Sequence, residues 1–236
     1  MDLTIRRLAA LWLTAVLCAA GLCGCAGRPA AFTVNGLAVE KAELVHYMQE
    51  YSAVVAAALD NEGLDSFRDD FWTAPQNGVD TFARLQDYTM QAITRQKVEQ
   101  LCAREEGIDT PLYYSEQLTQ MQKQNRQRAA AYAAGEVLYG PVERDFVSYF
   151  SEWYLAMQQQ CRAALIQKGI LTAPEDEVNA YYEAHRENFA AESREDACYR
   201  IREFLFDEAY TAYIDELAAQ ASVKEGEARI LPEEVF

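Results

Sequence analysis

The fold is decided most clearly by residues 146–168, which read FVSYFSEWYLAMQQQCRAALIQK. Large apolar side chains recur in this stretch at spacings of three and four residues, which places them on one face of a helix. The members of this stripe are Phe146, Phe150, Trp153, Met157, Cys161 and Leu165. Gly169 follows the stripe, and glycine commonly ends a helix because it accepts a positive φ. The sequence therefore predicts a long amphipathic helix over residues 143–168.

The same helical periodicity extends on both sides of this stretch. Further helices are predicted over residues 40–59, 79–106, 112–134, 174–189 and 194–221. Residues 32–39 read FTVNGLAV, and their Asn-Gly pair predicts a tight hairpin of two short strands. Residues 222–224 and 229–231 are candidates for further short strands. The predicted fold class is therefore mostly α with a few short β-strands.

The segment 112–134 differs from the other predicted helices because glutamine crowds it and only Leu118 and Met121 are clear apolar anchors. A solvated helix is the first interpretation. One wall of a groove, or a mobile arm, is the alternative that the residues leave open.

Composition and charge narrow the class of protein. Half of the residues are apolar and 11% are aromatic, which is enough for a packed core. The net charge is −16; residues 1–24 contribute +1, from two arginines and one aspartate, so the remainder carries −17. A strongly anionic surface repels phosphate backbones. We therefore expect no binding of nucleic acid.

The N-terminus has the pattern of an export leader. Arg6 and Arg7 precede an apolar run over residues 8–22, which is shorter than the ~20 residues that a membrane span needs. The run ends in Leu22-Cys23-Gly24-Cys25, which resembles the lipobox of bacterial lipoproteins. This resemblance implies a signal peptide over residues 1–24, a lipidated Cys25 and a short tether over residues 25–31. An uncleaved anchor or a plain secretory signal is the alternative, and either also places the domain outside the cytoplasm.

The remainder of the chain shows no pattern of catalytic or metal-binding chemistry. Its two histidines, His46 and His185, are far apart, and no Cys, Asp or Glu lies at metal-ligand spacing from either. Cys102, Cys161 and Cys198 are odd in number and widely spaced, which favours three thiols over a disulfide framework. A pair such as Cys161–Cys198 stays open. We predict no catalytic residue, no metal and no cofactor.

Three segments together resemble the SurA/PrsA group of extracytoplasmic chaperones. In the first, Val34-Asn35-Gly36 and Val39 lead into a helix that begins Lys41-Ala42-Glu43-Leu44. The second is LCAREEGI at residues 101–108, and the third is EDEVNAYYEAHRENF at residues 175–189. The stretch from Tyr213 to Val223 is also similar to the closing helix and strand of that group.

The resemblance implies both a fold and a function. It implies one SurA/trigger-factor-like helical domain over residues 32–236, whose N- and C-terminal parts pack together. It also implies a chaperone that is anchored by lipid on the extracytoplasmic face of the bacterial cell membrane and binds unfolded or partly folded secreted proteins. The apolar cradle is predicted to include Phe67, Phe71, Trp72, Phe150, Trp153 and Tyr154. A homodimer stays open.

The chain departs from many members of this group in one respect. Their parvulin prolyl-isomerase domain follows the third segment, whereas only residues 190–194 intervene here before the final helix. We therefore expect no enzyme activity. Two alternatives remain, namely a scaffold lipoprotein with one dedicated protein partner and a residual prolyl isomerase. Pairing of residues 32–39 with residues 222–231 is the structural feature that the resemblance requires.

Overall fold

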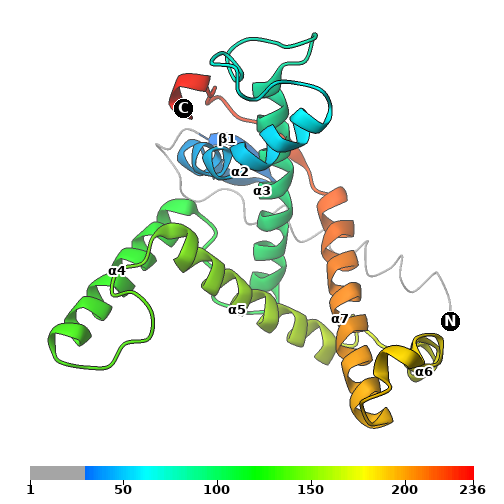
Figure 1. Ribbon diagram of the computed structural model, residues 1–236. Coiled ribbons are helices and arrows are strands. Elements are labelled where there is room, and N and C mark those ends of the chain that lie inside the picture. Colours follow the sequence, from blue (N-terminus) through cyan, green and yellow to red (C-terminus); the bar gives the residue numbers. More distant parts are fainter. Residues whose placement is uncertain (1–29) are drawn as a thin grey trace. The chain divides into compact units, whose positions relative to one another are not determined.

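The computed structural model describes residues 30–236, drawn in colour in Figure 1. The predicted leader, Cys25 and most of the predicted tether lie outside the described residues. The described chain is mostly helical, with six α-helices and one three-stranded antiparallel sheet, so the predicted fold class is confirmed at this level. It divides into two compact units, one formed by residues 30–94 with 221–236 and one formed by residues 95–220.

A small sheet in the first unit joins the two ends of the described chain. Strands β1 (Ala30–Val34) and β2 (Leu37–Glu40) form the predicted hairpin, and Asn35 and Gly36 take the positive φ values of 50° and 82° that its turn requires. Strand β3 (Val223–Glu225) pairs with the other edge of β1, with Val34 opposite Val223. The pairing that the resemblance requires is therefore present. Residues 229–231 form no strand, so that prediction is wrong; the backbone N–H of Ala228, which donates to the carbonyl of Ala30, makes the last of the backbone hydrogen bonds to β1.

Helix α2 (Lys41–Asn61) follows the hairpin, as its periodicity predicts. Leu44, Met48, Val55 and Leu59 are all buried, which confirms the predicted core face. The loop after α2 consists of turns, and helix α3 (Thr81–Glu105) begins in this unit and continues into the second one.

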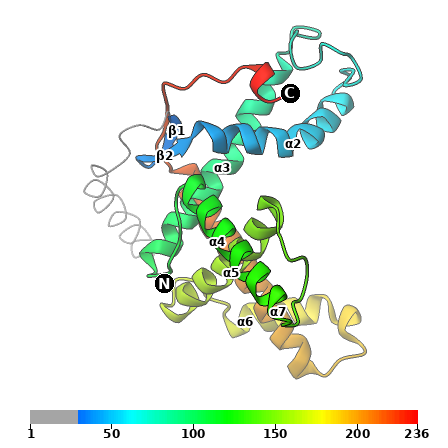
Figure 2. The same cartoon turned by 90° about the vertical axis from the view of Figure 1, so that its left-hand side faces the viewer.

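The C-terminal segment is held against α2, and Figure 2 shows it in red. Lys41 Nζ lies 2.6 Å from a carboxylate oxygen of Glu234, and the Gln49 amide donates a hydrogen bond to the carbonyl of Val235. The hydrogen bond from Lys41 holds the pKa of Glu234 below its ordinary value. This contribution to stability is therefore present above the ordinary carboxyl pKa and is lost as the pH falls through the lowered one.

The second unit contains the other helices. They are α4 (Tyr114–Ala133), α5 (Phe146–Gln167), α6 (Glu175–Ala184), a short 3-10 turn (Arg186–Phe189) and α7 (Arg194–Ala219). Asp145 caps α5 by accepting from the backbone N–H of Ser148, and Ser193 caps α7 by accepting from that of Asp196. All members of the apolar stripe on α5 are buried except Trp153, which is half-buried.

Two hydrophobic clusters form the core of this unit. The larger one brings together side chains of α3, α5 and α7, including Met157, Leu165 and Ile214. The smaller one joins α6 to the start of α7 through Val178, Tyr182 and Ile201. Among residues 30–236, no helix combines the length and the apolar character that crossing a bilayer requires.

Candidate functional site

The predicted cradle residues of the first unit differ widely in exposure. Phe67 is 94% exposed, whereas Phe71 is only 3% exposed. Trp72 is half-buried, and its ring stacks on that of Phe236 with the centroids 5.1 Å apart. Of these three side chains, only Phe67 is fully available to another protein in this conformation.

The predicted cradle residues of the second unit belong largely to its core. Phe150 is buried, and its ring stacks between those of Phe146 and Tyr154, at centroid distances of 5.5 and 5.1 Å. Trp153 and Tyr154 are half-buried, and both pack against the larger core cluster. The two predicted groups thus lie in different units, and a client-binding role for the six residues stays a prediction.

A buried carboxylate explains why Tyr154 faces inward. Glu99 on α3 is fully buried and accepts hydrogen bonds from the hydroxyl of Tyr154, from Gln158 Nε2 at 2.9 Å and from the hydroxyl of Tyr210 at 2.6 Å. The guanidinium of Arg95 lies 3.5 Å from the Oε2 atom of Glu99. This network connects α3, α5 and α7, and it was not foreseen because Glu99 is far from its tyrosine partners in the sequence.

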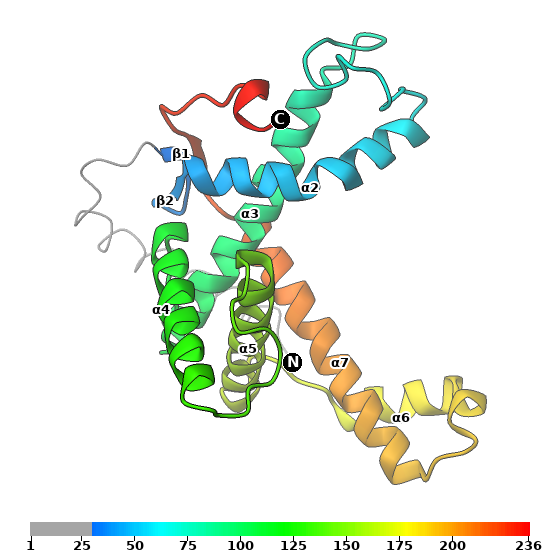
Figure 3. The same ribbon diagram turned by 60° about the vertical axis from the view of Figure 1, so that its left-hand side comes forward.

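The segment 118–145, which we name the arm, is the least buried part of the second unit. It comprises most of α4 and the loop that connects α4 to α5, and none of its residues is buried. Figure 3 shows the loop leaving the far end of α4 and running back to the start of α5. The starts of α4 and α5 are in contact, because the rings of Tyr114 and Phe146, their first residues, meet edge to face with centroids 4.8 Å apart. The prediction of a solvated helix agrees with this exposure.

Polar side chains of α4 fix the course of the returning loop. The side-chain amide of Asn125 donates to the carbonyl of Arg144 at 2.9 Å and accepts from its backbone N–H at 3.1 Å. The guanidinium of Arg128 donates to the carbonyls of Tyr139 and Pro141, each at 2.7 Å. These bonds satisfy backbone groups that no helix or strand pairs, so the loop has a defined conformation.

The arm presents large apolar side chains to solvent. Tyr132 is 64% exposed, Val137 85% and Tyr139 88%. Large apolar side chains exposed on one segment of a protein are candidates for an interaction surface. Sequence reasoning missed these residues, although one signal was present: Val137 and Tyr139 are apolar residues in a segment between Gly135 and Gly140 that cannot be helical core.

The charge of the arm also differs from that of the chain. It carries four basic side chains (Lys123, Arg126, Arg128 and Arg144) and three acidic ones (Glu136, Glu143 and Asp145), a net charge of +1. The whole chain carries −16, so all of its excess negative charge lies outside the arm. A negatively charged polypeptide segment, which the anionic surface repels, can therefore approach the arm without this repulsion.

The described residues show no arrangement typical of a metal site, because residues 30–236 contain no group of three or more His, Cys, Asp or Glu that could hold an ion. His185 Nδ1 lies 2.9 Å from the carbonyl of Tyr181 and its ring stacks on that residue, while partial burial lowers the pKa of His46. Both histidine rings thus pack against neighbouring tyrosine rings, His46 against Tyr47 and His185 against Tyr181.

The comparisons with known proteins add no relative. No family model matches the chain, and no curated protein or solved structure is significantly similar to it. The likeness to the SurA/PrsA group stays an expectation from the sequence motifs.

Proposed function

We propose that the protein is a lipid-anchored chaperone of the extracytoplasmic membrane face, which binds unfolded secreted polypeptides and uses the arm as a contact surface. The observation that carries this proposal is the exposure of Tyr132, Val137 and Tyr139 on a segment that contributes no residue to the core. A core role cannot account for these side chains, and apolar side chains on a surface favour contact with other apolar groups.

The chemistry of the arm suits binding of many sequences rather than one. Tyrosine and valine offer apolar contact without a directional requirement, and the glutamine and arginine side chains of α4 can donate to any peptide carbonyl. Surfaces of this adaptable kind are typical of promiscuous binders. Phe67 in the first unit is a second exposed aromatic side chain that could contribute.

The sheet that joins the chain ends supports the same proposal. The resemblance requires that the N-terminal hairpin pair with a strand after the last helix, and β1 pairs with β3 in this way. The hydrogen bond from the backbone N–H of Asn35 to the carbonyl of Ser222 continues the pairing beyond the strand. The lipidated Cys25 would lie only a few residues before β1, which would hold the sheet close to the membrane.

Replacing the three apolar side chains of the arm tests the proposal. We expect the variant Tyr132→Ser, Val137→Ser, Tyr139→Ser to lose most of its ability to suppress aggregation of unrelated unfolded proteins, such as thermally unfolded citrate synthase and reduced insulin. Its thermal stability should stay close to that of the parent, since no buried contact is removed. Light scattering and circular dichroism measure the two quantities.

A matched control replaces three exposed apolar side chains of the same unit outside the arm, as Leu155→Ser, Ile170→Ser, Tyr199→Ser. This variant should keep the activity of the parent. A parent protein that suppresses aggregation of neither substrate would contradict the proposal and favour a scaffold with one partner. Equal losses in the two variants would contradict the role of the arm.

A further inference from the structure

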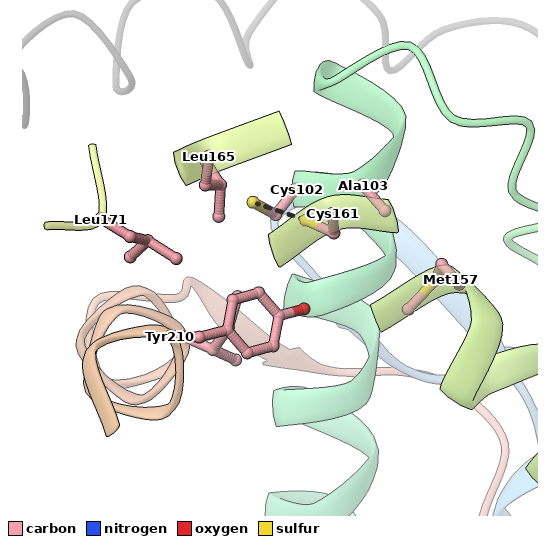
Figure 4. Close-up of a cluster of buried hydrophobic side chains, with 8 residues drawn as sticks. Cys102, Ala103, Met157, Cys161, Leu165, Leu171 and Tyr210 are labelled. Carbon is pink, nitrogen blue, oxygen red and sulfur yellow. Dashed lines mark hydrogen bonds between the residues drawn. The ribbon is translucent and has the colours of Figure 1, made fainter. Parts of the chain in front are cut away.

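Two buried cysteines on different helices face each other in the second unit. Cys102 on α3 and Cys161 on α5 place their Sγ atoms 3.7 Å apart. Figure 4 shows the contact as a dashed line, with Leu165, Met157 and Tyr210 around the pair. Cys198 packs instead against the smaller core cluster, which contains neither of these residues. The sequence left Cys161–Cys198 open as a pair, and the structure places Cys102 opposite Cys161.

We propose that Cys102 and Cys161 are a disulfide-forming pair, which an oxidising disulfide converts into a covalent link between α3 and α5. The sulfur atoms of a disulfide lie about 2.05 Å apart, so the two need to approach by roughly 1.7 Å. Both cysteines are buried, so the link would be shielded from reductants once the unit has folded. An extracytoplasmic protein would meet oxidising conditions, but the pairing itself does not depend on the proposed function.

Both thiols lie in the same buried environment, which affects their reactivity. The contact with the Cys161 thiol and burial in the core raise the pKa of Cys102. Since the thiolate is the reactive form, either sulfur can attack first once it has lost its proton, and both orders give the same link.

Oxidised glutathione can supply the chemistry in two exchange steps. In the first, the sulfur of one of the two cysteines, for example Cys161, attacks glutathione disulfide, a mixed disulfide forms, and one reduced glutathione leaves with the proton of the Cys161 thiol. In the second, the sulfur of Cys102 attacks the Cys161 sulfur of that mixed disulfide and a second glutathione leaves with its proton. Two protein thiols are oxidised and one glutathione disulfide is reduced, so atoms and electrons balance.

Mass spectrometry of the full chain tests the pairing directly. The reduced protein is refolded from urea with oxidised glutathione, so that both thiols are accessible, and its free thiols are alkylated before digestion with trypsin. Cleavage at Lys and Arg places Cys102 in peptide 98–104, Cys161 in peptide 145–162 and Cys198 in peptide 195–200, each with one cysteine. We expect most of the chain to yield peptide 98–104 linked to peptide 145–162, with peptide 195–200 unlinked.

The link should also stabilise the folded chain, because it closes a loop of about 60 residues in the unfolded state. We expect the melting temperature of the disulfide-linked chain to exceed that of the reduced chain by on the order of 10 °C. Cys198→Ala should keep both the link and this difference, whereas Cys102→Ala should lose both. Recovery of both peptides as alkylated or glutathione-bound species, or a link that mainly involves Cys198, would overturn the proposal.

Discussion

Replacing Glu99 with leucine lowers the free energy of unfolding by about 3–5 kcal/mol, the range found when one partner of a buried charged network is removed. The substitution leaves the hydroxyls of Tyr154 and Tyr210 and the amide of Gln158 without their shared acceptor in a buried site. Each such group costs about 1–3 kcal/mol when it is left unsatisfied. Arg95 keeps a partner, because its Nε lies 2.7 Å from Asp215. Urea denaturation followed by circular dichroism measures the change.

Removing the donors together with the acceptor separates hydrogen bonding from packing. The single variant Tyr210→Phe should cost less than Glu99→Leu, since one donor of several is lost. The triple variant Glu99→Leu, Tyr154→Phe, Tyr210→Phe should be more stable than Glu99→Leu alone, because the stranded hydroxyls are gone. A change below about 1 kcal/mol for Glu99→Leu, within the range of a single ordinary hydrogen bond, would contradict a structural role of the network.

Replacing Gly226 with alanine should destabilise the first unit by about 1–3 kcal/mol or more, as overpacking at a tight contact does. A Cβ atom at this position would lie 2.2 Å from the carbonyl oxygen of Ala30 and 2.8 Å from its carbonyl carbon. These are backbone atoms of β1, so no side chain can move aside. The backbone N–H of Gly226 also donates to the carbonyl of Ala31 at 2.9 Å, and a shift of the chain would weaken that bond.

Hydrogen exchange of the β1 amides locates the effect of this variant. We expect faster exchange in β1 and β3 of Gly226→Ala, whereas helices α4 to α7 should exchange as in the parent. Glu227→Ala is the matched control, since Glu227 is the exposed neighbour and its change should be small. Unchanged exchange in β1 would show that β1 and the segment after α7 are not held together in this way.

The local elements were predictable from the sequence because their causes are local. The stripe from Phe146 to Leu165 has helical spacing, which predicts that its side chains share one face of α5, and all of them except Trp153 are buried. The Asn35-Gly36 turn was predictable because these two residues tolerate the positive φ that a tight hairpin needs.

The candidate site was harder to predict because its residues depend on contacts that are distant in the sequence. Phe71 and Phe150 were natural guesses for an apolar binding surface, but the helix or loop that carries each of them turns it inward. Tyr139 is exposed on a loop that Arg128 holds by a hydrogen bond to its carbonyl, and no periodicity reveals this bond. Residue type therefore identified apolar side chains, and only the tertiary structure separated core from surface.

Site-specific photo-crosslinking is the most direct test of whether the arm contacts unfolded polypeptides. A benzoyl-phenylalanine at position 139, in the arm, is compared with one at position 199, where Tyr199 is 62% exposed in the same unit outside the arm. With reduced insulin present, we expect crosslinks from position 139 that disappear when native, oxidised insulin is used, and few from position 199. Absence of crosslinks from position 139, or equal yields from both positions, would contradict the account.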